Sequence, residues 1–290
     1  MRGLLLNAVA AHTRRISHLA FLPNGDLISG SVDGSLAAWD KFGCVGRAHS
    51  HRRGITGSVA AAGRERVVTI SFDGTAQLHT GRGLAGSKVL QRRRRGFSRV
   101  ARGPGRLMLC ASFDGTVTAF QPASTAVSER ITWRGPAFVA AAGGASVYTW
   151  SVHGPVQLRA AASLEHIEDL PTGAYMTHDV WAGSNGYVYT YNYDHVLRTW
   201  LAAPWVLVAE TYVPVQGRLQ ILRVGGGKVW LGGERCYVLV DTRSGYVELQ
   251  EQVDGLSALA IHPSEPIIAC GLRDGTLQLW RWADSAITKN

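Results

Sequence analysis

The sequence is short of cysteine, of lysine and of long apolar runs, and these shortages exclude several classes of protein. The four cysteines are too few and too scattered for a disulfide framework or a cysteine-based zinc site. The longest segment without a charged side chain, 135–158, is broken by two adjacent glycines and a proline, so a membrane-spanning helix is not expected. These absences predict a reduced intracellular protein, cytoplasmic or nuclear, with the mitochondrion as an alternative.

Arginine supplies almost all of the positive charge. Of the 30 basic side chains, only Lys41, Lys88, Lys228 and Lys289 are lysines, and the formal net charge is +9. The charge is uneven, because residues 1–110 contain 18 basic and 5 acidic side chains, whereas residues 111–290 contain 12 and 16. A GC-rich coding sequence produces an arginine bias by itself, but guanidinium groups also suit phosphate and carboxylate partners.

The chain lacks helical periodicity and instead repeats. A segment made of a strand, a turn residue and a second strand recurs, with turn residues at Asp33, Asp73, Asp114, His153, Asp194 and Asp274. The spacings are 40, 41, 39, 41 and 80 residues, and a degenerate copy at 227–241 fills the middle of the last gap. Self-similarity at this period indicates seven repeats of about 41 residues each.

Each repeat has the pattern of four short strands. Apolar and β-branched runs alternate with clusters of Gly, Asn, Asp or Pro, which is typical of half-buried strands. The dipeptide Asp-Gly, which favours hairpins because the turn needs positive φ, occurs at 33–34, 73–74, 114–115 and 274–275. The pattern predicts an all-β solenoid or propeller.

Residues 11–40 carry a family resemblance. This segment has a His before its first strand, a Pro-Asn-Gly turn, a Ser-Gly-Ser strand, Asp-Gly and a closing Trp39-Asp40, and in these features it resembles a WD40 repeat. The resemblance is sharp in repeats 1 and 7 and reaches the other repeats through the period. It implies one seven-bladed WD40 β-propeller over 1–290, with repeats at approximately 11–48, 49–91, 92–131, 132–170, 171–212, 213–251 and 252–290.

The two ends of the chain bear on the closure of this ring. The last repeat runs out of strand after Trp280 or Trp282, whereas residues 3–9 precede the first innermost strand, expected at 16–21, and have no other structural use. In the family the N-terminal segment commonly completes the last blade, which covers an otherwise open edge strand. We therefore expect 3–9 to close the ring. A cleaved targeting peptide is the alternative for the same segment.

The resemblance also implies a buried polar tetrad in repeat 1, formed by His12, Ser29, Asp33 and Trp39. In this tetrad the Asp carboxylate accepts a hydrogen bond from the His ring, the other ring nitrogen meets the Ser hydroxyl, and the Trp N–H completes the set. The residues four positions before the turns form a column of small hydroxyls and thiols: Ser29, Thr69, Cys110, Thr149, Thr190 and Cys270. This column predicts a structural role for two of the cysteines. The His is missing from most other repeats.

The connections between repeats concentrate arginine. In the expected propeller, the connection from each last strand to the next first strand lies on the same face as the Asp-Gly turns. The connections of four neighbouring repeats carry Arg14, Arg15, Arg52, Arg53, Arg92, Arg93, Arg94, Arg95 and Arg134. We expect them to form one basic rim, whose field raises the local concentration of polyanions. A solvated loop without a specific role is the alternative for the run 92–95.

The residue before each of these turns often faces the central opening of a WD40 propeller. In this chain these positions include Phe72, Phe113 and Tyr193, which predict a stacking or peptide-docking platform beside the arginines. Packing between blades is the alternative for Phe72 and Phe113, and the two interpretations have equal weight.

The sequence contains no catalytic, cofactor-binding or metal-binding motif, so we expect no enzyme, no cofactor and no small-molecule substrate. The favoured function is a non-catalytic scaffold in a multi-subunit assembly, which docks on RNA of a ribonucleoprotein or on an acidic protein surface. The first alternative is a peptide-binding adaptor that uses the central aromatic opening. Phosphoinositide or membrane-surface binding ranks third, because 94–96 resembles only part of a Phe-Arg-Arg-Gly motif.

Overall fold

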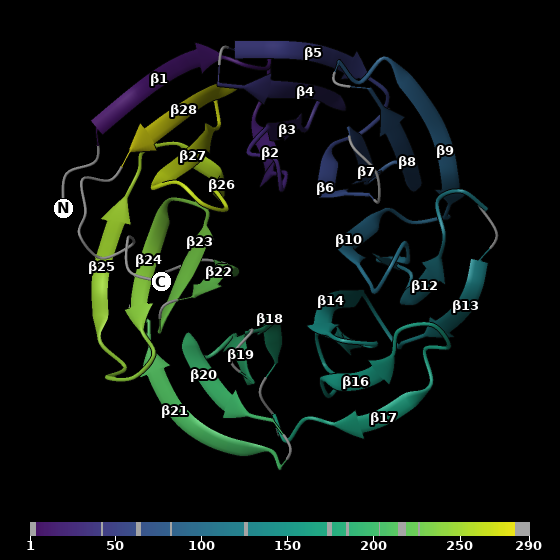
Figure 1. Ribbon diagram of the computed structural model, residues 1–290, viewed down its shortest axis with the longest axis vertical. Coiled ribbons are helices and arrows are strands. Elements are labelled where there is room, and N and C mark those ends of the chain that lie inside the picture. Colours follow the sequence, from purple (N-terminus) through teal and green to yellow (C-terminus); the bar gives the residue numbers. More distant parts are fainter. Residues whose placement is uncertain are drawn as a thin grey trace.

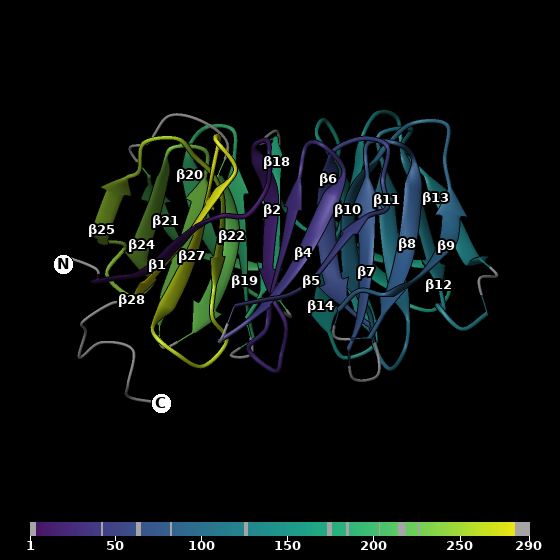
Figure 2. The ribbon, with the colours of Figure 1, turned by 90° about the horizontal axis from the view of Figure 1, so that it is seen from above.

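The computed structural model describes the chain except residues 1–3, 42, 62–64, 82, 125–126, 173–175, 184–185, 203, 214–218, 226 and 282–290. The described residues form seven four-stranded antiparallel sheets, arranged as blades around a central axis, and contain no helix (Figure 1). Seen from the side, the blades form a disc with turns on its two opposite faces (Figure 2). The predicted all-β, seven-bladed propeller is confirmed.

The blades follow the repeats, and the strands of each blade are ordered from the innermost outward. Blade 1 contains β2 (Ile16–Phe21), β3 (Leu27–Ser31), β4 (Ser35–Asp40) and β5 (Gly43–His49). Blade 2 contains β6 (Ile55–Ala60), β7 (Arg66–Ser71), β8 (Thr75–Thr80) and β9 (Gly86–Arg92). Blade 3 contains β10 (Phe97–Arg102), β11 (Met108–Ser112), β12 (Thr116–Phe120) and β13 (Val127–Thr132). Blade 4 contains β14 (Ala137–Gly143), β15 (Ser146–Ser151), β16 (Gln157–Ala160) and β17 (His166–Asp169).

The remaining three blades complete the ring. Blade 5 contains β18 (Thr177–Ala182), β19 (Tyr187–Asn192), β20 (Val196–Leu201) and β21 (Val206–Tyr212). Blade 6 contains β22 (Leu219–Gly225), β23 (Lys228–Gly233), β24 (Cys236–Asp241) and β25 (Val247–Gln252). Blade 7 contains β26 (Leu256–Ile261), β27 (Ile267–Leu272), β28 (Thr276–Arg281) and, as its outermost strand, β1 (Leu4–Ala10).

Apolar packing between neighbouring blades forms the core. In blade 1, for example, all five residues of β3 are buried, because other blades or strands cover both of its faces. Seven apolar clusters result, and each of them draws its members from two adjacent blades. The cluster between blades 7 and 1 includes Ile16, Trp39 and Leu277, so the first and last repeats are joined by side-chain packing.

The N-terminal strand closes the ring, as the sequence predicted. β1 pairs antiparallel with β28, with Leu5 opposite Trp280 and Ala10 opposite Thr276. The backbone N–H groups of Ala11 and His12 then both donate to the carbonyl oxygen of Gly275, at 3.0 and 3.1 Å. The strand that was expected to be left open at the edge of blade 7 is therefore covered, and the first innermost strand has the expected bounds.

A belt of hydroxyl groups joins the innermost strands, and nothing in the repeat pattern predicted it. Neighbouring blades share no strand ladder, but the second residue of several innermost strands donates a hydrogen bond to a backbone carbonyl oxygen of the next blade. The donors and acceptors are Ser257 and Ile16 (2.7 Å), Ser17 and Ile55 (2.7 Å), Thr56 and Phe97 (2.8 Å), and Ser98 and Ala137. The belt therefore links blades 7, 1, 2, 3 and 4 in order.

Candidate functional site

The arginine-bearing connections lie on the face of the disc that also carries the Asp-Gly turns. Backbone hydrogen bonds fix this arrangement, because the residue before each turn donates its N–H to the connection in the same blade. Phe72 donates to Gly54 at 3.0 Å, and Phe113 donates to Gly96 at 2.9 Å. In blade 1, Val32 donates to Arg15 at 3.0 Å. The connections before β2, β6, β10 and β14 therefore emerge side by side on one face (Figure 2).

Seven of the nine predicted rim arginines are exposed on this face, and we call these seven the arginine face: Arg14, Arg52, Arg53, Arg92, Arg94, Arg95 and Arg134. Among the residues that the structure describes, none of the seven makes an ion pair with a carboxylate. No direct ion pair within the described part of the chain therefore offsets their charges.

The exposed arginines occupy equivalent positions in successive blades. In each connection a backbone N–H donates to the turn glycine of the preceding blade. Among these donors are His12, His51, Arg93 and Trp133, in blades 1 to 4. The residue that directly follows this donor is arginine in blades 2, 3 and 4: Arg52, Arg94 and Arg134. The residue two positions after the donor is arginine in blades 1, 2 and 3: Arg14, Arg53 and Arg95. The fold thus turns four stretches of sequence into one regular arc of guanidinium groups.

Arg93 departs from the prediction that the whole run 92–95 forms the rim. Its backbone N–H donates to Gly74 at 2.7 Å, which places Arg93 where blade 2 has His51. Its side chain is partly buried, and burial together with the nearby Arg130 lowers the pKa of its guanidinium, while Asp114 opposes that shift. Arg93 is therefore partly buried in the connection before β10, whereas Arg92, Arg94 and Arg95 are exposed.

Arg15, in the connection before blade 1, differs from the seven arginines of the arginine face because it forms an ion pair with Glu234. Its guanidinium lies 3.1 Å from one carboxylate oxygen of Glu234, and the other oxygen of Glu234 lies 3.3 Å from Arg273. All three side chains are about half exposed, so these ion pairs contribute little to stability. The single carboxylate of Glu234 is shared by two guanidinium groups, so it offsets only part of the charge of Arg15.

Three aspartates share this part of the face, and turn hydrogen bonds occupy them. Asp33 accepts from the backbone N–H of Ser35 at 2.8 Å, and Asp73 accepts from the backbone N–H groups of Thr75 and Arg52, each at 2.8 Å. Burial raises the pKa of each aspartate, but the hydrogen bonds outweigh burial and hold the pKa of Asp33, Asp73 and Asp114 below its usual value. The three carboxylates therefore stay ionised within their turns, and they are outnumbered by the arginines.

Two of the three predicted aromatic side chains lie together. Phe72 and Phe113 stack with ring centroids 5.4 Å apart and ring planes inclined by 15°, and Phe72 remains 47% exposed. Tyr193, in blade 5, instead stacks on His178 with centroids 3.4 Å apart. The structure therefore combines both interpretations of the phenylalanines, since they pack between blades 2 and 3 while one ring stays open to solvent.

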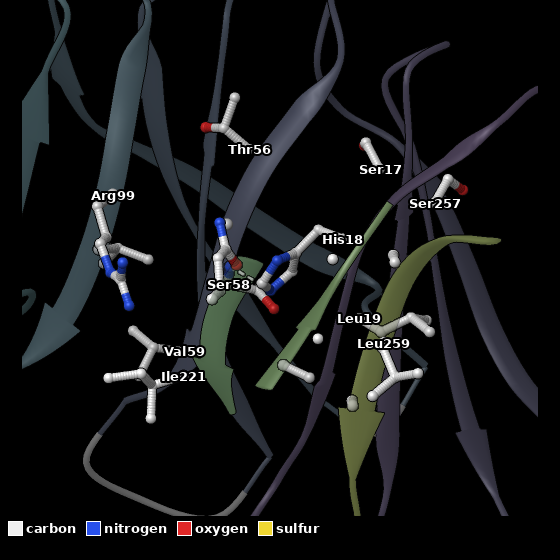
Figure 3. A pocket seen from close by; sticks show the side chains of 18 of the residues that line it. Ser17, His18, Leu19, Thr56, Ser58, Val59, Arg99, Ile221, Ser257 and Leu259 are labelled. Carbon is white, nitrogen blue, oxygen red and sulfur yellow. Dashed lines mark hydrogen bonds between the residues drawn. The ribbon is translucent and has the colours of Figure 1, made fainter. Parts of the chain in front are cut away.

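The central cavity is a separate feature. It has a volume of about 690 Å³ and is lined by residues of all seven innermost strands, including His18, Ser58 and Arg99 (Figure 3). Phe72, Phe113 and Tyr193 are not among its lining residues, so the prediction that they face the central opening does not hold for this cavity. Their place before the turns keeps them on the face of the disc.

A buried ion pair crosses the cavity wall, and sequence reasoning missed it. Arg99 of blade 3 pairs with Asp179 of blade 5, whose side chain is fully buried. The Asp179 carboxylate also accepts from the backbone N–H of Ile221 in blade 6, at 2.7 Å. Nearby, the Nε2 atom of His18 accepts from the backbone N–H of Ser58 at 3.0 Å, and burial together with Arg99 lowers the His18 pKa to about 4.

The tetrad in blade 1 is confirmed in two of its three contacts. His12 Nε2 lies 2.8 Å from the Ser29 hydroxyl, and the Trp39 indole N–H donates to the same oxygen at 2.8 Å. The predicted contact between Asp33 and the His ring is wrong, because His12 Nδ1 meets the Ser35 hydroxyl at 2.6 Å. The Ser35 hydroxyl stands between the two groups, since the turn brings it closer to the ring.

Blade 2 contains a second network of the same kind. His51 Nδ1 lies 2.9 Å from the Thr75 hydroxyl and 3.3 Å from Asp73, while His51 Nε2 lies 2.8 Å from the Thr69 hydroxyl. The Trp is replaced by His79, whose Nε2 atom lies 2.9 Å from Thr69. His51 therefore has in blade 2 the place that His12 has in blade 1.

The predicted hydroxyl and thiol column lies in the interior. All six of its members are at most 1% exposed. Burial raises the pKa of the Cys110 and Cys270 thiols to about 12, which keeps them protonated and supports the structural role predicted for them. In blade 5 the Trp200 indole N–H donates to Thr190 at 3.0 Å, which repeats the contact between Trp39 and Ser29.

The described part of the chain shows neither a metal cluster nor a membrane-spanning helix. No three side chains of His, Cys, Asp or Glu in that part are arranged to hold a metal ion. In the same residues, no helix has the length and apolar character needed to cross a bilayer.

Comparison with known proteins agrees with this architecture. The family model described as "WD domain, G-beta repeat" matches residues 3–40 and 247–281, which contain the first and last repeats. The fold is similar to the WD40 β-propeller domain of Doa1, whose crystal structure aligns with a TM-score of 0.84, covers 99% of both chains and shares 10% sequence identity. No curated protein matches the sequence.

The matched repeats and the fold define a seven-bladed propeller of the WD40 class. The family model covers the first and last repeats, and the other five repeats share the propeller fold with them. Propellers of this class commonly serve as non-catalytic scaffolds for protein interactions, and they are generally not enzymes.

Proposed function

We propose that this protein is a non-catalytic scaffold that docks on RNA, within a ribonucleoprotein assembly, through the arginine face. The observation that carries the proposal is an arc of seven exposed arginines without carboxylate partners among the described residues. Such an arc attracts a polyanion because bound phosphates release condensed counterions, which makes the affinity depend steeply on salt.

The regular repetition of the arginines favours RNA over an acidic protein. Arginines recur at matching positions in three successive blades, and a nucleic acid carries its charges at a regular spacing along one strand. An acidic protein surface has no such periodicity. Guanidinium groups also present a fixed fork of donors that matches phosphate oxygens.

The proposal is tested by measuring the affinity of a short RNA of mixed sequence at several salt concentrations. The double variant R53Q/R94Q removes two exposed arginines of the face, and we expect the salt slope to fall by about 1.5, at about 0.7–0.9 per lost phosphate contact. The matched control is R102Q/R106Q, which removes the same charge from two exposed arginines at the end of β10 and in the β10–β11 turn, on the opposite face.

Two outcomes overturn the proposal. If both double variants lower the slope equally, RNA responds to net charge and not to the arginine face. If RNA does not bind while a polyglutamate peptide binds in a manner that R53Q/R94Q weakens, the partner is an acidic protein.

A further inference from the structure

The stacked phenylalanines add a second kind of contact to the arginine face. Phe72 is 47% exposed although it is aromatic, and its ring is supported from one side by Phe113 at 5.4 Å. The support is rigid, because the backbone N–H groups of both residues are bonded to the connections that carry the arginines. A planar ring held in this way offers one free face to solvent.

A glycine keeps Phe72 in place. A Cβ atom on Gly96 would lie 2.6 Å from the Phe72 Cα atom, which is closer than real Cβ atoms approach. Gly96 follows Arg95 directly, so the chain passes from the exposed arginines to the base of the aromatic stack within one residue. The charged arc and the aromatic ring are therefore parts of one surface.

We propose that the arginine face binds RNA in its single-stranded form, with an unpaired base stacked on Phe72 and the flanking phosphates on the arginines. The inference rests on the proposed function and specifies its ligand. Every base has a π-face that can stack on an aromatic ring, whereas the bases of a duplex are already stacked on one another.

The shape of the arc supports the same conclusion. The arginines follow four consecutive blades around the central axis, so a bound polyanion must curve within the width of one propeller (Figure 1). Duplex DNA has a persistence length of about 150 base pairs and bends at a high cost over such a distance, and duplex RNA is also a stiff rod. A single strand follows the arc freely.

The charges of the neighbouring blades set the limit of the arc. On blades 6 and 7 the same face presents the exposed carboxylates of Glu234, Asp254 and Asp274 beside the exposed guanidinium groups of Arg235 and Arg273. The charge there is mixed, and the carboxylate of Glu234 is shared between Arg15 and Arg273 at the boundary. A bound strand therefore extends from blade 1 toward blade 4, and Phe72 of blade 2 lies within that path.

The experiment compares an oligouridine strand with an RNA duplex of equal length, using wild type, F72L, F72W and the control Y246L. Tyr246 is an aromatic side chain that is 68% exposed in the β24–β25 turn on the opposite face, so its loss controls for the removal of a surface ring. We expect the single strand to bind at least about tenfold more tightly than the duplex. F72L is expected to weaken the single strand about tenfold, while F72W and Y246L bind as wild type does.

A strand that contains 2-aminopurine supplies an independent readout, because the fluorescence of this base falls when it stacks. We expect quenching with wild type and F72W, and its loss with F72L. If duplex and single strand bind equally, or if F72L leaves single-strand affinity and quenching unchanged, the inference is wrong. In that case R53Q/R94Q still weakens RNA binding if the proposed function holds, so the two failures are distinguishable.

Discussion

Replacing Asp179 by alanine removes a fully buried carboxylate that connects three blades. Its oxygen atoms pair with Arg99 from blade 3 and accept the backbone N–H of Ile221 from blade 6, while the residue itself belongs to blade 5. The hydroxyl belt does not continue through blades 4, 5 and 6, because the second residues of β14, β18 and β22 have no hydroxyl group. Asp179 therefore lies in the part of the ring where the hydroxyl belt does not link neighbouring blades.

The expected loss follows from the burial of the pair. Asp179 is 0% exposed and Arg99 is 22% exposed, so D179A leaves a mostly buried guanidinium without its partner and a backbone N–H without its acceptor. Removal of one partner of a buried pair costs about 3–5 kcal/mol, and the partial exposure of Arg99 favours the lower end, about 3 kcal/mol. D179N retains one acceptor oxygen and is expected to lose about half as much.

The assay is urea unfolding, followed by far-ultraviolet circular dichroism and tryptophan fluorescence, whose transitions must coincide for a two-state analysis. The control is D254A, because Asp254 is an exposed carboxylate in the β25–β26 turn and its loss is expected to change stability by less than about 0.5 kcal/mol. The double variant R99M/D179A removes the orphaned charge and is expected to be more stable than D179A. A D179A protein as stable as D254A, or additive losses in the double variant, would refute the reasoning.

Two further predictions concern the histidine networks. S29A removes the hydroxyl that contacts both His12 and Trp39 and is expected to cost about 2 kcal/mol in urea unfolding, whereas S29T keeps the hydroxyl and recovers part of the loss. Burial lowers the pKa of His12 and of His79 from 6.5 to about 4, so the unfolded chain takes up protons first as the pH falls. The free energy of unfolding should therefore decline from pH 6.5 toward pH 4, and a midpoint of thermal unfolding that stays constant over this range would contradict the assignment.

The blade count was predictable because the Asp-Gly turns recur with the period of one blade. Each turn needs a glycine with positive φ, which is found at Gly34, Gly74, Gly115 and Gly275, so a requirement of the backbone left a regular mark on the sequence. The closure by β1 was predictable for a related reason. The C-terminal part of the sequence supplies three strands of blade 7, and the extra N-terminal strand β1 supplies the fourth by pairing with β28.

The contact predicted between Asp33 and His12 was wrong because the family resemblance did not include the hydroxyl group of Ser35, although the sequence shows this residue. A hydroxyl residue follows two positions after the turn aspartate in blades 1, 2 and 3, at Ser35, Thr75 and Thr116. In blades 1 and 2 this hydroxyl is the group that meets the histidine Nδ1 atom. The repeated pattern was therefore a signal for the linking hydroxyl, although only the geometry of the turn decides which oxygen is nearer.

The pairing of Arg99 with Asp179 could not be read from spacing alone. Each is the third residue of an innermost strand, where a β-bulge shifts the register after the first residue. The two strands belong to blades 3 and 5, with blade 4 between them. Such a bulge re-aims the side chain that follows it. The sequence shows opposite charges at matching positions, but the contact depends on the curvature of the ring, which brings blades 3 and 5 within reach of each other across blade 4.

The positions of the arginines distinguish an effect of coding bias from a binding surface. Arg198, a buried arginine, is paired, because its guanidinium contacts Asp194 at 2.6 Å and Glu210 at 2.7 Å. A coding bias raises the arginine content everywhere, and a duplicated ancestral repeat would place arginine at matching positions in all seven blades. Neither alone explains why exposed arginine occupies matching connection positions in blades 1–4, whereas blade 7 has Asp254 and Gly255 at those positions. A one-sided field costs electrostatic self-repulsion, which a bound polyanion would relieve. The arginine face, and not the net charge, is therefore the feature on which the RNA proposal depends.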